Sequence, residues 1–393
     1  MPTPPFEKTE YESRLRRVRA RMEAAGIDLL LLADPANMNY LTGYDGWSFY
    51  VPQLVAVPCQ GNEDPLWLGR AMDRAQAPLT SWLPDARVIG YPESYVQRSD
   101  RHPMDWIADH LKGRGWDGRR IGTETDVYYF SPKALERLRA GLPNAEFVDA
   151  DLLVNWVRAV KSPAEIACMR EAASLVGGAM RAAFDAIEPG VRQCDAIARI
   201  YAAQIAGEAG FAGDITGLCP LIMSGRAAAA PHPMWTDDRF ERDQTTAIEL
   251  GAARRHYHAS LARTLHVGRP PQRLMDTAKI VEEGLEAALA AMRPGVEAGA
   301  VEAAWRRVLD RHGLKKESRI GYSIGLGYPP DWGEHTISLR PGDATVLEPC
   351  NTFHIILGMW MEGWGMETSE TVLITEQGAE CLTRFPRGVH VKD

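Results

Sequence analysis

The chain has 393 residues, of which 45% are hydrophobic and 24% charged, and its formal net charge is −8 at pH 7. A chain of this length and composition can bury a large core, and we expect it to form two domains. Because it is acidic and has no block of lysine or arginine, it lacks the electrostatic footprint of a protein that binds nucleic acid or anionic membranes, so a small molecule is the expected partner.

The sequence also indicates the compartment. The N-terminal residues have no apolar core of the kind found in signal peptides, and no uninterrupted apolar run approaches the length of a membrane span. The six cysteines are scattered without a C-x-x-C pair, which favours reduced thiols over disulfides or a zinc site. A cytoplasmic protein is therefore expected.

The first segment alternates between helical and strand patterns. Apolar residues at helical spacing predict a helix from about Tyr11 to Met22, Gly26 is its expected C-cap, and Ile27 to Leu32 has the pattern of a buried strand. Further strands are expected at residues 54–57 and 146–148, and a further helix at residues 132–140. These elements predict a mixed α/β domain over residues 1–155.

A capping box marks the start of the second domain, expected at residues 156–393. In the sequence "VKSPAEIACM", Ser162 is suited to cap a helix, Pro163 to occupy its first position, and Glu165 to complete the box. Further helices are expected at about residues 192–208, 272–292 and 298–312, and strands at residues 344–347, 352–357 and 371–374.

Several motifs of the second domain carry a family resemblance. The segments "MSGRAAAAPHP", "IELGAARRHYHASLARTLHVG", "GYSIGLGYPP", "ATVLEPC" and "SETVLIT" resemble the creatinase, prolidase and methionine aminopeptidase superfamily, and "DPANMNYLTGY" is similar to the N-terminal domain of its creatinase and prolidase branch. The resemblance implies an α/β (α+β) fold. A mixed N-terminal domain would precede a "pita-bread" domain, in which helices cover a curved, mostly antiparallel sheet.

The same motifs indicate which metal ligands are missing. Peptidases of this superfamily bind two divalent metals through two aspartates, a histidine and two glutamates. The five positions fall, in chain order, on Glu249, Ser260, Tyr322, Glu348 and Ser369. A shift of one or two residues would bring Glu370 or Glu367 to the last position. About three of the five ligands would then remain, too few for a tight dinuclear site, so we expect neither a catalytic metal nor another cofactor.

The remaining acidic residues argue against an inactive relic of the fold. Glu249 and Glu348 occupy positions that the resemblance directs toward the centre of the sheet, where unpaired carboxylates are costly unless a cation arrives. His232 falls where creatinase-like and prolidase-like members have an active-site histidine. A buried acidic pocket with one histidine and no metal suits a small organic cation.

Three further segments, "GYDGWSFYVPQ", "GYPPDWGEHTISLRPGD" and "GMWMEGWGMETSETV", resemble the ectoine hydrolases of this superfamily. The resemblance implies opening of the cyclic amidine of ectoine to an N-acetylated diaminobutyrate, a deacetylase as the next enzyme, and a homodimer; acceptance of hydroxyectoine is left open. Three alternatives also remain open: a creatinase-like hydrolase of a guanidino acid, a metal-dependent prolidase-type peptidase, and a noncatalytic binder of a small zwitterionic cation.

The chemistry of an amidinium suggests a role for each catalytic candidate. Glu249 would either activate water or attack the amidinium carbon directly, and Glu348 would pair with the amidinium N–H groups. His232 would transfer protons, because the ordinary pKa of histidine lies near neutrality. Tyr322 would donate a hydrogen bond to the tetrahedral intermediate or to the substrate carboxylate.

Aromatic residues are candidates for binding the substrate. Trp47, Phe49 and Tyr50 suit either a buried or interfacial patch or, by the resemblance, a lid over the cation contributed by the second subunit. Trp360 and Trp364 suit either cation–π contacts or alternate positions on one half-buried strand.

Other polar residues near these motifs are expected to surround the site or to support the fold. Glu367 and Glu334 are candidates to reach the site from its surroundings. His256 and His258 flank the hairpin turn and are expected to be solvated, and Arg263 is expected to have a structural role.

Overall fold

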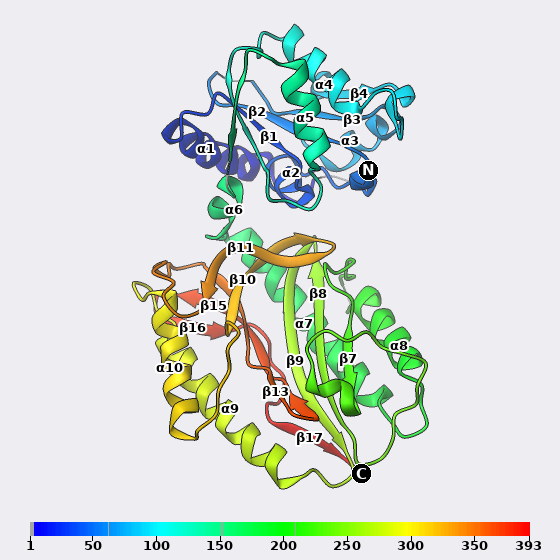
Figure 1. The fold of residues 1–393 in the computed structure, drawn as a ribbon, viewed down its shortest axis with the longest axis vertical. Coiled ribbons are helices and arrows are strands. Elements are labelled where there is room, and N and C mark those ends of the chain that lie inside the picture. Colours follow the sequence, from blue (N-terminus) through cyan, green and yellow to red (C-terminus); the bar gives the residue numbers. More distant parts are fainter. Residues whose placement is uncertain (1–3, 62, 151, 209) are drawn as a thin grey trace. The chain divides into compact units, whose positions relative to one another are not determined.

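A computed structural model describes residues 4–61, 63–150, 152–208 and 210–393 (Figure 1). The chain divides into two compact units, of which the first ends at Val157 and the second begins at Arg158. The boundary lies within the short helix α6 (Leu153–Arg158).

A mixed sheet of six strands forms the centre of the N-terminal unit as described. Its strands are β1 (Leu29–Leu32), β2 (Leu54–Pro58), β3 (Leu66–Arg70), β4 (Val88–Tyr91), β5 (Arg120–Thr123) and β6 (Glu146–Asp149). They lie in the order β4-β3-β2-β1-β5-β6, and β1 pairs antiparallel with β2 and parallel with β5. All four leucines of β1 are buried, as expected for a central strand covered on both faces.

Side chains cap the first turn of several helices in this unit. The Asp34 side chain accepts a hydrogen bond from the Ala36 N–H at the start of α2, and Ser131 accepts one from the Ala134 N–H at the start of α5. The helices are α1 (Lys8–Ala24), α2 (Pro35–Thr42), α3 (Ala77–Thr80), α4 (Pro103–Gly113) and α5 (Pro132–Gly141). They include both helices that the sequence predicted here.

A sheet of nine strands forms the centre of the C-terminal unit in the described part of the chain. Its path is β16-β15-β12-β10-β9-β8-β7, with β11 beside β10 and β17 beside β9. The pairs are antiparallel except for β17 with β9. The strands are β7 (Leu221–Ser224), β8 (Thr245–Arg254), β9 (Tyr257–Val267), β10 (Gly321–Tyr328), β11 (Asp331–Leu339), β12 (Thr352–Ile356), β15 (Ser369–Thr375), β16 (Gly378–Cys381) and β17 (Val389–Lys392). β13 (Met359–Met361) and β14 (Trp364–Met366) form a separate hairpin.

The β8–β9 hairpin is the long, curved strand pair in Figure 1. Its ladder ends at Arg254 opposite Tyr257, and the two turn residues, Arg255 and His256, have φ angles of 53° and 62°. Two-residue hairpin turns need this left-handed conformation and usually fill it with Asn or Gly. The His256 ring stacks on Tyr328 with centroids 4.2 Å apart, so packing holds the bulky turn in place.

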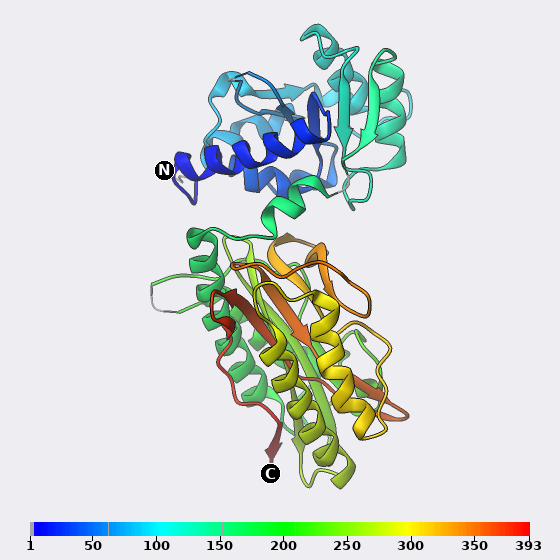
Figure 2. The same ribbon diagram turned by 90° about the vertical axis from the view of Figure 1, so that its left-hand side faces the viewer.

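Two pairs of helices pack around this sheet, α7 with α8 and α9 with α10, and α7 lies against β8 and β9. The helices are α7 (Pro163–Ala186), α8 (Gln193–Ala206), α9 (Gln272–Ala291) and α10 (Ala298–Arg311). Figure 2 shows α9 and α10 side by side. At the start of α7, Ser162 and Glu165 each accept the backbone N–H of the other, which confirms the predicted capping box.

The expected fold class is confirmed by the mixed N-terminal unit and the mostly antiparallel C-terminal sheet. The strand predicted at residues 344–347 is wrong, because Val346 forms only an isolated bridge with Glu297. The Thr345 carbonyl instead accepts the Ala298 N–H at the start of α10. This segment therefore serves a helix end whose N–H groups need partners.

No described helix combines the length and the apolar composition that crossing a bilayer requires.

Candidate active site

Two buried carboxyl groups come together on the C-terminal sheet. Glu249 lies in β8 opposite Ala262 of β9 and is 3% exposed. Glu367 follows β14, is 2% exposed, and its Oε2 has no hydrogen-bond partner among the described residues. The Thr264 hydroxyl accepts the N–H of Glu367 and donates to its carbonyl, both at 2.9 Å. The backbone that carries Glu367 is therefore fixed on β9.

The surroundings of these two groups favour their protonated forms. Burial, followed by the charge of Asp331, raises the pKa of Glu249 from 4.5 to about 7. Burial, followed by the charge of Glu249, raises the pKa of Glu367 well above 4.5, while Lys316 opposes this rise. Because neighbouring carboxylates resist ionising together, the pair retains a proton near neutral pH.

A buried lysine lies close enough to Glu367 for its charge to act there. Lys316, between α10 and β10, is 6% exposed and donates to the Gly358 carbonyl at 2.8 Å, and its Nζ lies 4.4 Å from the centroid of the Trp360 ring. Burial lowers its pKa from 10.5 to about 8, and the charge of Glu367 opposes this. Sequence analysis missed Lys316, since nothing in "HGLKKES" distinguishes it from its exposed neighbour Lys315.

Tyr322 of β10 belongs to a chain of hydrogen bonds beside the carboxyl pair. Its hydroxyl accepts from Trp332 Nε1 at 2.9 Å and lies 3.0 Å from His354 Nδ1. His354 of β12 is fully buried, and its Nε2 has no partner in the part of the chain described. Burial, followed by the charge of Arg319, lowers the pKa of His354 to about 3, so its ring is neutral. Burial, followed by the charge of Glu249, raises the pKa of Tyr322, so its phenol keeps its proton.

The direction of the hydrogen bond between Tyr322 and His354 depends on the tautomer of His354. Because the indole of Trp332 can only donate, the Tyr322 hydroxyl keeps its own proton for a second partner. It donates that proton to His354 when His354 Nδ1 carries none. The sequence did not single out His354, because a lone histidine in an apolar strand is usually a core residue.

The two-metal site of the superfamily's peptidases does not fit the side chains present. Ser260 stands at the second aspartate position, and its buried Oγ has no hydrogen-bond partner among the described residues. Ser369 is at the last glutamate position. Its hydroxyl accepts the Ala262 N–H at 2.6 Å and so bonds to the backbone of β9. Tyr322 stands at the histidine position. Within the described ranges, no three His, Cys, Asp or Glu side chains are grouped so that they could hold a metal ion.

Two predicted catalytic residues lie at the surface. Glu348 is exposed in the turn before β12, where its N–H donates to Asn351 Oδ1 at 2.7 Å. Its exposure gives no support to the predicted place of Glu348 at the centre of the sheet, which stays a prediction; Cys350 turns the chain there with a φ of 69°. His232 is exposed between η5 (Gly225–Ala229) and β8, and no hydrogen bond joins it to the buried carboxyl pair in the described chain.

The first predicted aromatic group lies in the N-terminal unit. Trp47 and Tyr50 are 51% and 66% exposed, and Phe49 is half-buried with its ring centroid 4.7 Å from that of Trp47. Two exposed aromatic rings at one turn suit a contact surface. Their role as a lid stays a prediction.

The second predicted aromatic group lies on a hairpin. Trp360 is in β13 and Trp364 in β14, and Met361 pairs with Trp364 across a turn that contains Gly363. The prediction that both tryptophans alternate along one strand is wrong, because the "EG" dipeptide reverses the chain between them. Only Trp360 contacts the buried lysine, whereas Trp364 lies under the Arg273 guanidinium.

The histidines of the hairpin turn are buried, so the prediction that they are solvated is wrong. His256 is 7% exposed and His258 is fully buried. His258 Nε2 accepts the Gly217 N–H at 2.8 Å, and its Nδ1 lies 2.8 Å from the His256 carbonyl, to which it donates. Burial lowers the pKa of His258 to about 4. Backbone groups occupy both of its nitrogens, which gives it a structural role.

Arg263 of β9 is buried with a full set of partners. Its guanidinium donates to the carbonyls of Ala262, Ser369, Phe385 and Pro386 and to Glu370 Oε1. Glu370 also accepts from Arg387 Nε at 2.9 Å and from the Thr383 hydroxyl. Glu370 is thus committed to a structural network, which leaves Glu367 as the acidic residue of this segment beside Glu249.

Glu334 is also paired away from the carboxyl pair. It accepts from Lys161 Nζ at 2.5 Å, and both side chains are buried. A Cβ atom at Gly325 would lie 2.4 Å from Glu334 Oε1, so the glycine makes room for this ion pair.

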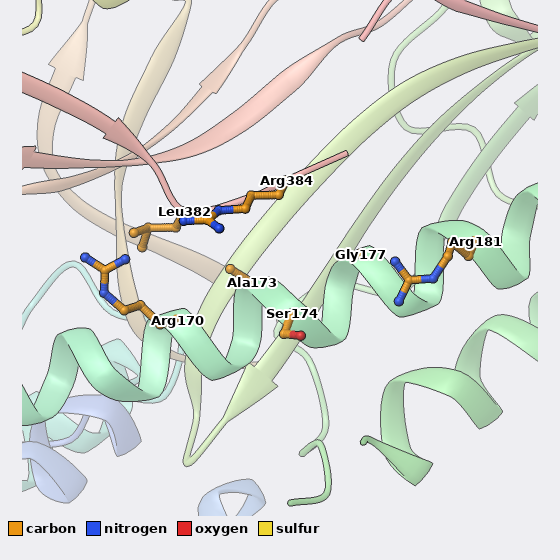
Figure 3. Close-up of a pocket in the computed structure, with 7 residues that line it drawn as sticks. All are labelled: Arg170, Ala173, Ser174, Gly177, Arg181, Leu382 and Arg384. Carbon is orange, nitrogen blue, oxygen red and sulfur yellow. The ribbon is translucent and has the colours of Figure 1, made fainter. Parts of the chain in front are cut away.

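A surface pocket of about 320 Å³ lies apart from these groups. Figure 3 shows Arg170, Ser174, Gly177 and Arg181 along one face of α7, opposite Arg384. The pocket contains none of the predicted site residues.

Comparison with known proteins identifies the family. Residues 167–376 match the metallopeptidase family M24, and residues 14–160 match the creatinase/prolidase N-terminal domain. The chain belongs to the M24 family.

Individual relatives cover nearly the whole chain. An ectoine hydrolase of Halomonas elongata is 44% identical over 99% of this chain and 98% of its own length. An uncharacterized hydrolase/peptidase of Sinorhizobium fredii is also 44% identical, over 99% of each chain. The crystal structure of a prolidase from Thermococcus sibiricus is 18% identical and superposes with a TM-score of 0.85, covering 98% of this chain and 100% of its own. This last likeness shows the shared fold.

Proposed function

We propose that this chain is a metal-independent hydrolase that opens the cyclic amidine of ectoine to an N-acetylated diaminobutyrate. The observation that carries the proposal is the buried pair Glu249 and Glu367, with which no described lysine, arginine or histidine forms an ion pair. The similarity to the ectoine hydrolase of Halomonas elongata supports the same substrate. The reaction belongs to the C-terminal domain, expected at residues 156–393.

The charge of the substrate suits this pair. An amidinium cation beside Glu249 lowers the cost of ionising that carboxyl group, because the opposite charge compensates for burial. Glu367 then keeps its proton, since its pKa is raised by burial and by the charge of Glu249. One carboxylate and one carboxylic acid are the two forms that hydrolysis of an amidine requires.

The bonds change in two stages. Glu249 either takes a proton from a water that attacks the amidinium carbon or attacks that carbon directly, and a C–O bond forms while electrons move onto nitrogen. Glu367 then protonates the departing ring nitrogen, and the C–N bond breaks. Either route consumes one water, with the direct attack followed by hydrolysis of the adduct. The proposal thus places Glu367 beside Glu249, where the sequence had placed Glu348, and gives it the proton transfer that the sequence had assigned to the exposed His232.

Proton NMR of ectoine incubated with chelator-treated, metal-assayed protein tests this function. Loss of the ring signals and growth of an open acetylated diamine are expected. Intact but broadened ectoine signals would favour a noncatalytic binder, and turnover only after addition of a divalent metal would favour a peptidase-like ligand set. Creatine and hydroxyectoine, assayed in parallel, decide between guanidine and amidine substrates and define the substrate range.

The family resemblance supports a proposal for the compartment, the oligomeric state and the next enzyme of the pathway. We infer a cytoplasmic homodimer in which Trp47, Phe49 and Tyr50 of one subunit cover the substrate of the other, with a deacetylase consuming the product. Sedimentation of the purified chain would test the dimer, and replacement of Tyr50 by alanine would test the lid through the KM for ectoine.

A further inference from the structure

The structure assigns to Lys316 an anion subsite: we propose that its ammonium group binds the substrate carboxylate while Glu249 binds the amidinium. The proposal rests on the proposed function and adds to it the group that recognises the acidic end of a zwitterion. It concerns a residue that the sequence did not single out.

Lys316 has an incomplete set of hydrogen-bond partners among the residues that the structure describes. An ammonium group has three N–H donors. One donates to the Gly358 carbonyl at 2.8 Å, and the ring of Trp360 lies 4.4 Å from the nitrogen. No carboxylate of the described chain forms an ion pair with it. When Glu367 is protonated, a lysine that is 6% exposed therefore has one carbonyl and one aromatic face to offset the loss of water.

A substrate with both a cation and a carboxylate balances the charges of the buried groups. In the proposed complex Glu249 is ionised and Glu367 is protonated, so the amidinium neutralises Glu249 and leaves Lys316 as an uncompensated cation. A substrate carboxylate completes the balance, because one buried ion pair then forms at each end of the ligand. A cation without a carboxylate would leave Lys316 unpaired.

Packing holds Lys316 in place. Its neighbour Trp360 belongs to the β13–β14 hairpin, and Gly358, which accepts its hydrogen bond, leads into that hairpin. A Cβ atom at Gly358 would lie 2.3 Å from the Trp360 ring, so the glycine allows the ring to fold back over this segment. The ammonium group is thereby directed by packing before any ligand arrives.

Pairing enzyme variants with substrates tests the subsite. Wild type, Lys316→Met and Lys316→Gln are compared on ectoine and on its decarboxylated analogue, the same methylated cyclic amidine without the carboxylate. For the wild type, removing the carboxylate should lower kcat/KM about 100-fold, as expected for a desolvated charge pair that loses one partner. For both variants kcat/KM on ectoine should fall by a similar factor, and the preference for ectoine over the analogue should shrink to about threefold or less.

Controls separate this role from a structural one. Lys315→Met removes the exposed neighbouring lysine and should leave both kcat/KM values and their ratio unchanged. Lys316→Gln retains a donor for the Gly358 carbonyl, so it gives the result if Lys316→Met fails to fold. Variants that keep the wild-type preference, or that lose activity equally on both substrates, would overturn the subsite.

Binding measurements distinguish failure of the proposed hydrolase function from failure of the Lys316 subsite. If the wild type leaves ectoine intact, the hydrolase proposal fails, and calorimetric titration of the four protein forms with both ligands tests the subsite by itself. A Kd ratio near 100 for the wild type and near 1 for the Lys316 variants would then support it. Equal ratios in all forms would refute it.

Discussion

Two groups of buried charges lie in or beside one sheet, and they differ in how completely their partners satisfy them. Arg263 and Glu370 fill their hydrogen-bonding positions with carbonyls, with Arg387 and with Thr383. Glu249 and Glu367 form no ion pair in the described chain, and Glu367 Oε2 has no hydrogen-bond partner there. The difference teaches that burial alone does not single out a candidate functional charge, whereas an incomplete set of partners does.

The largest expected effect is the loss of catalytic activity when Glu249 is replaced. Glu249→Gln removes the carboxylate while keeping the size of the side chain, and kcat should fall by about 10³-fold or more. Proton NMR of ectoine turnover measures the loss, and circular dichroism verifies the fold. Retention of more than a tenth of the wild-type rate would contradict the proposed role of Glu249.

Substitution within the Arg263 and Glu370 network should lower the free energy of unfolding. Arg263→Met leaves Glu370 with part of its network and should lower the free energy of unfolding by about 3–5 kcal/mol. Urea unfolding measures this, and Arg181→Met, an exposed substitution on α7, serves as the control. An equally large loss in the Arg181 variant would show that the method does not report the buried network.

The pH dependence of the unfolding free energy should report the raised pKa of Glu249. The pKa of Glu249 is raised in the folded state, so its favourable contribution is present below about pH 4.5 and is lost as pH rises through about 7. The rise from 4.5 to about 7 corresponds to about 3 kcal/mol. Glu249→Gln should therefore flatten the decline in unfolding free energy between these pH values, and a decline equal to that of wild type would argue against the raised pKa.

The smallest effect is expected at the surface. Glu348→Gln changes an exposed turn residue and should alter kcat/KM less than about twofold, in line with surface substitutions generally. The same NMR assay measures this. A loss comparable to that of Glu249→Gln would restore the role predicted from the sequence.

Local rules predicted much of the fold because they act over short stretches of chain. Ser162 and Glu165 form a capping box three residues apart, and the spacing of Tyr11 and Met22 on one helix face requires no knowledge of the rest of the molecule. The segment at residues 344–347 was predicted wrongly because its partner is a distant helix end, which its own composition does not indicate.

The site was predicted only in part for the same reason. Glu249 stands in a recognisable strand motif, whereas Lys316 and Lys315 are adjacent, identical residues with opposite exposure. The choice of Glu367 over Glu370 depended on which face of the chain meets β9, and a shift of one residue reverses that face. Tertiary packing decides such questions.

The tie between Thr264 and Glu367 has a consequence for the thermodynamics of the reaction. One hydroxyl holds both backbone groups of Glu367, so little rotational freedom remains to be lost when a substrate arrives. The amide proton of Glu367 should exchange with deuterium as slowly as those of the central strands. A backbone fixed before the substrate arrives predicts a smaller entropic cost of positioning Glu367 for the proposed proton transfer.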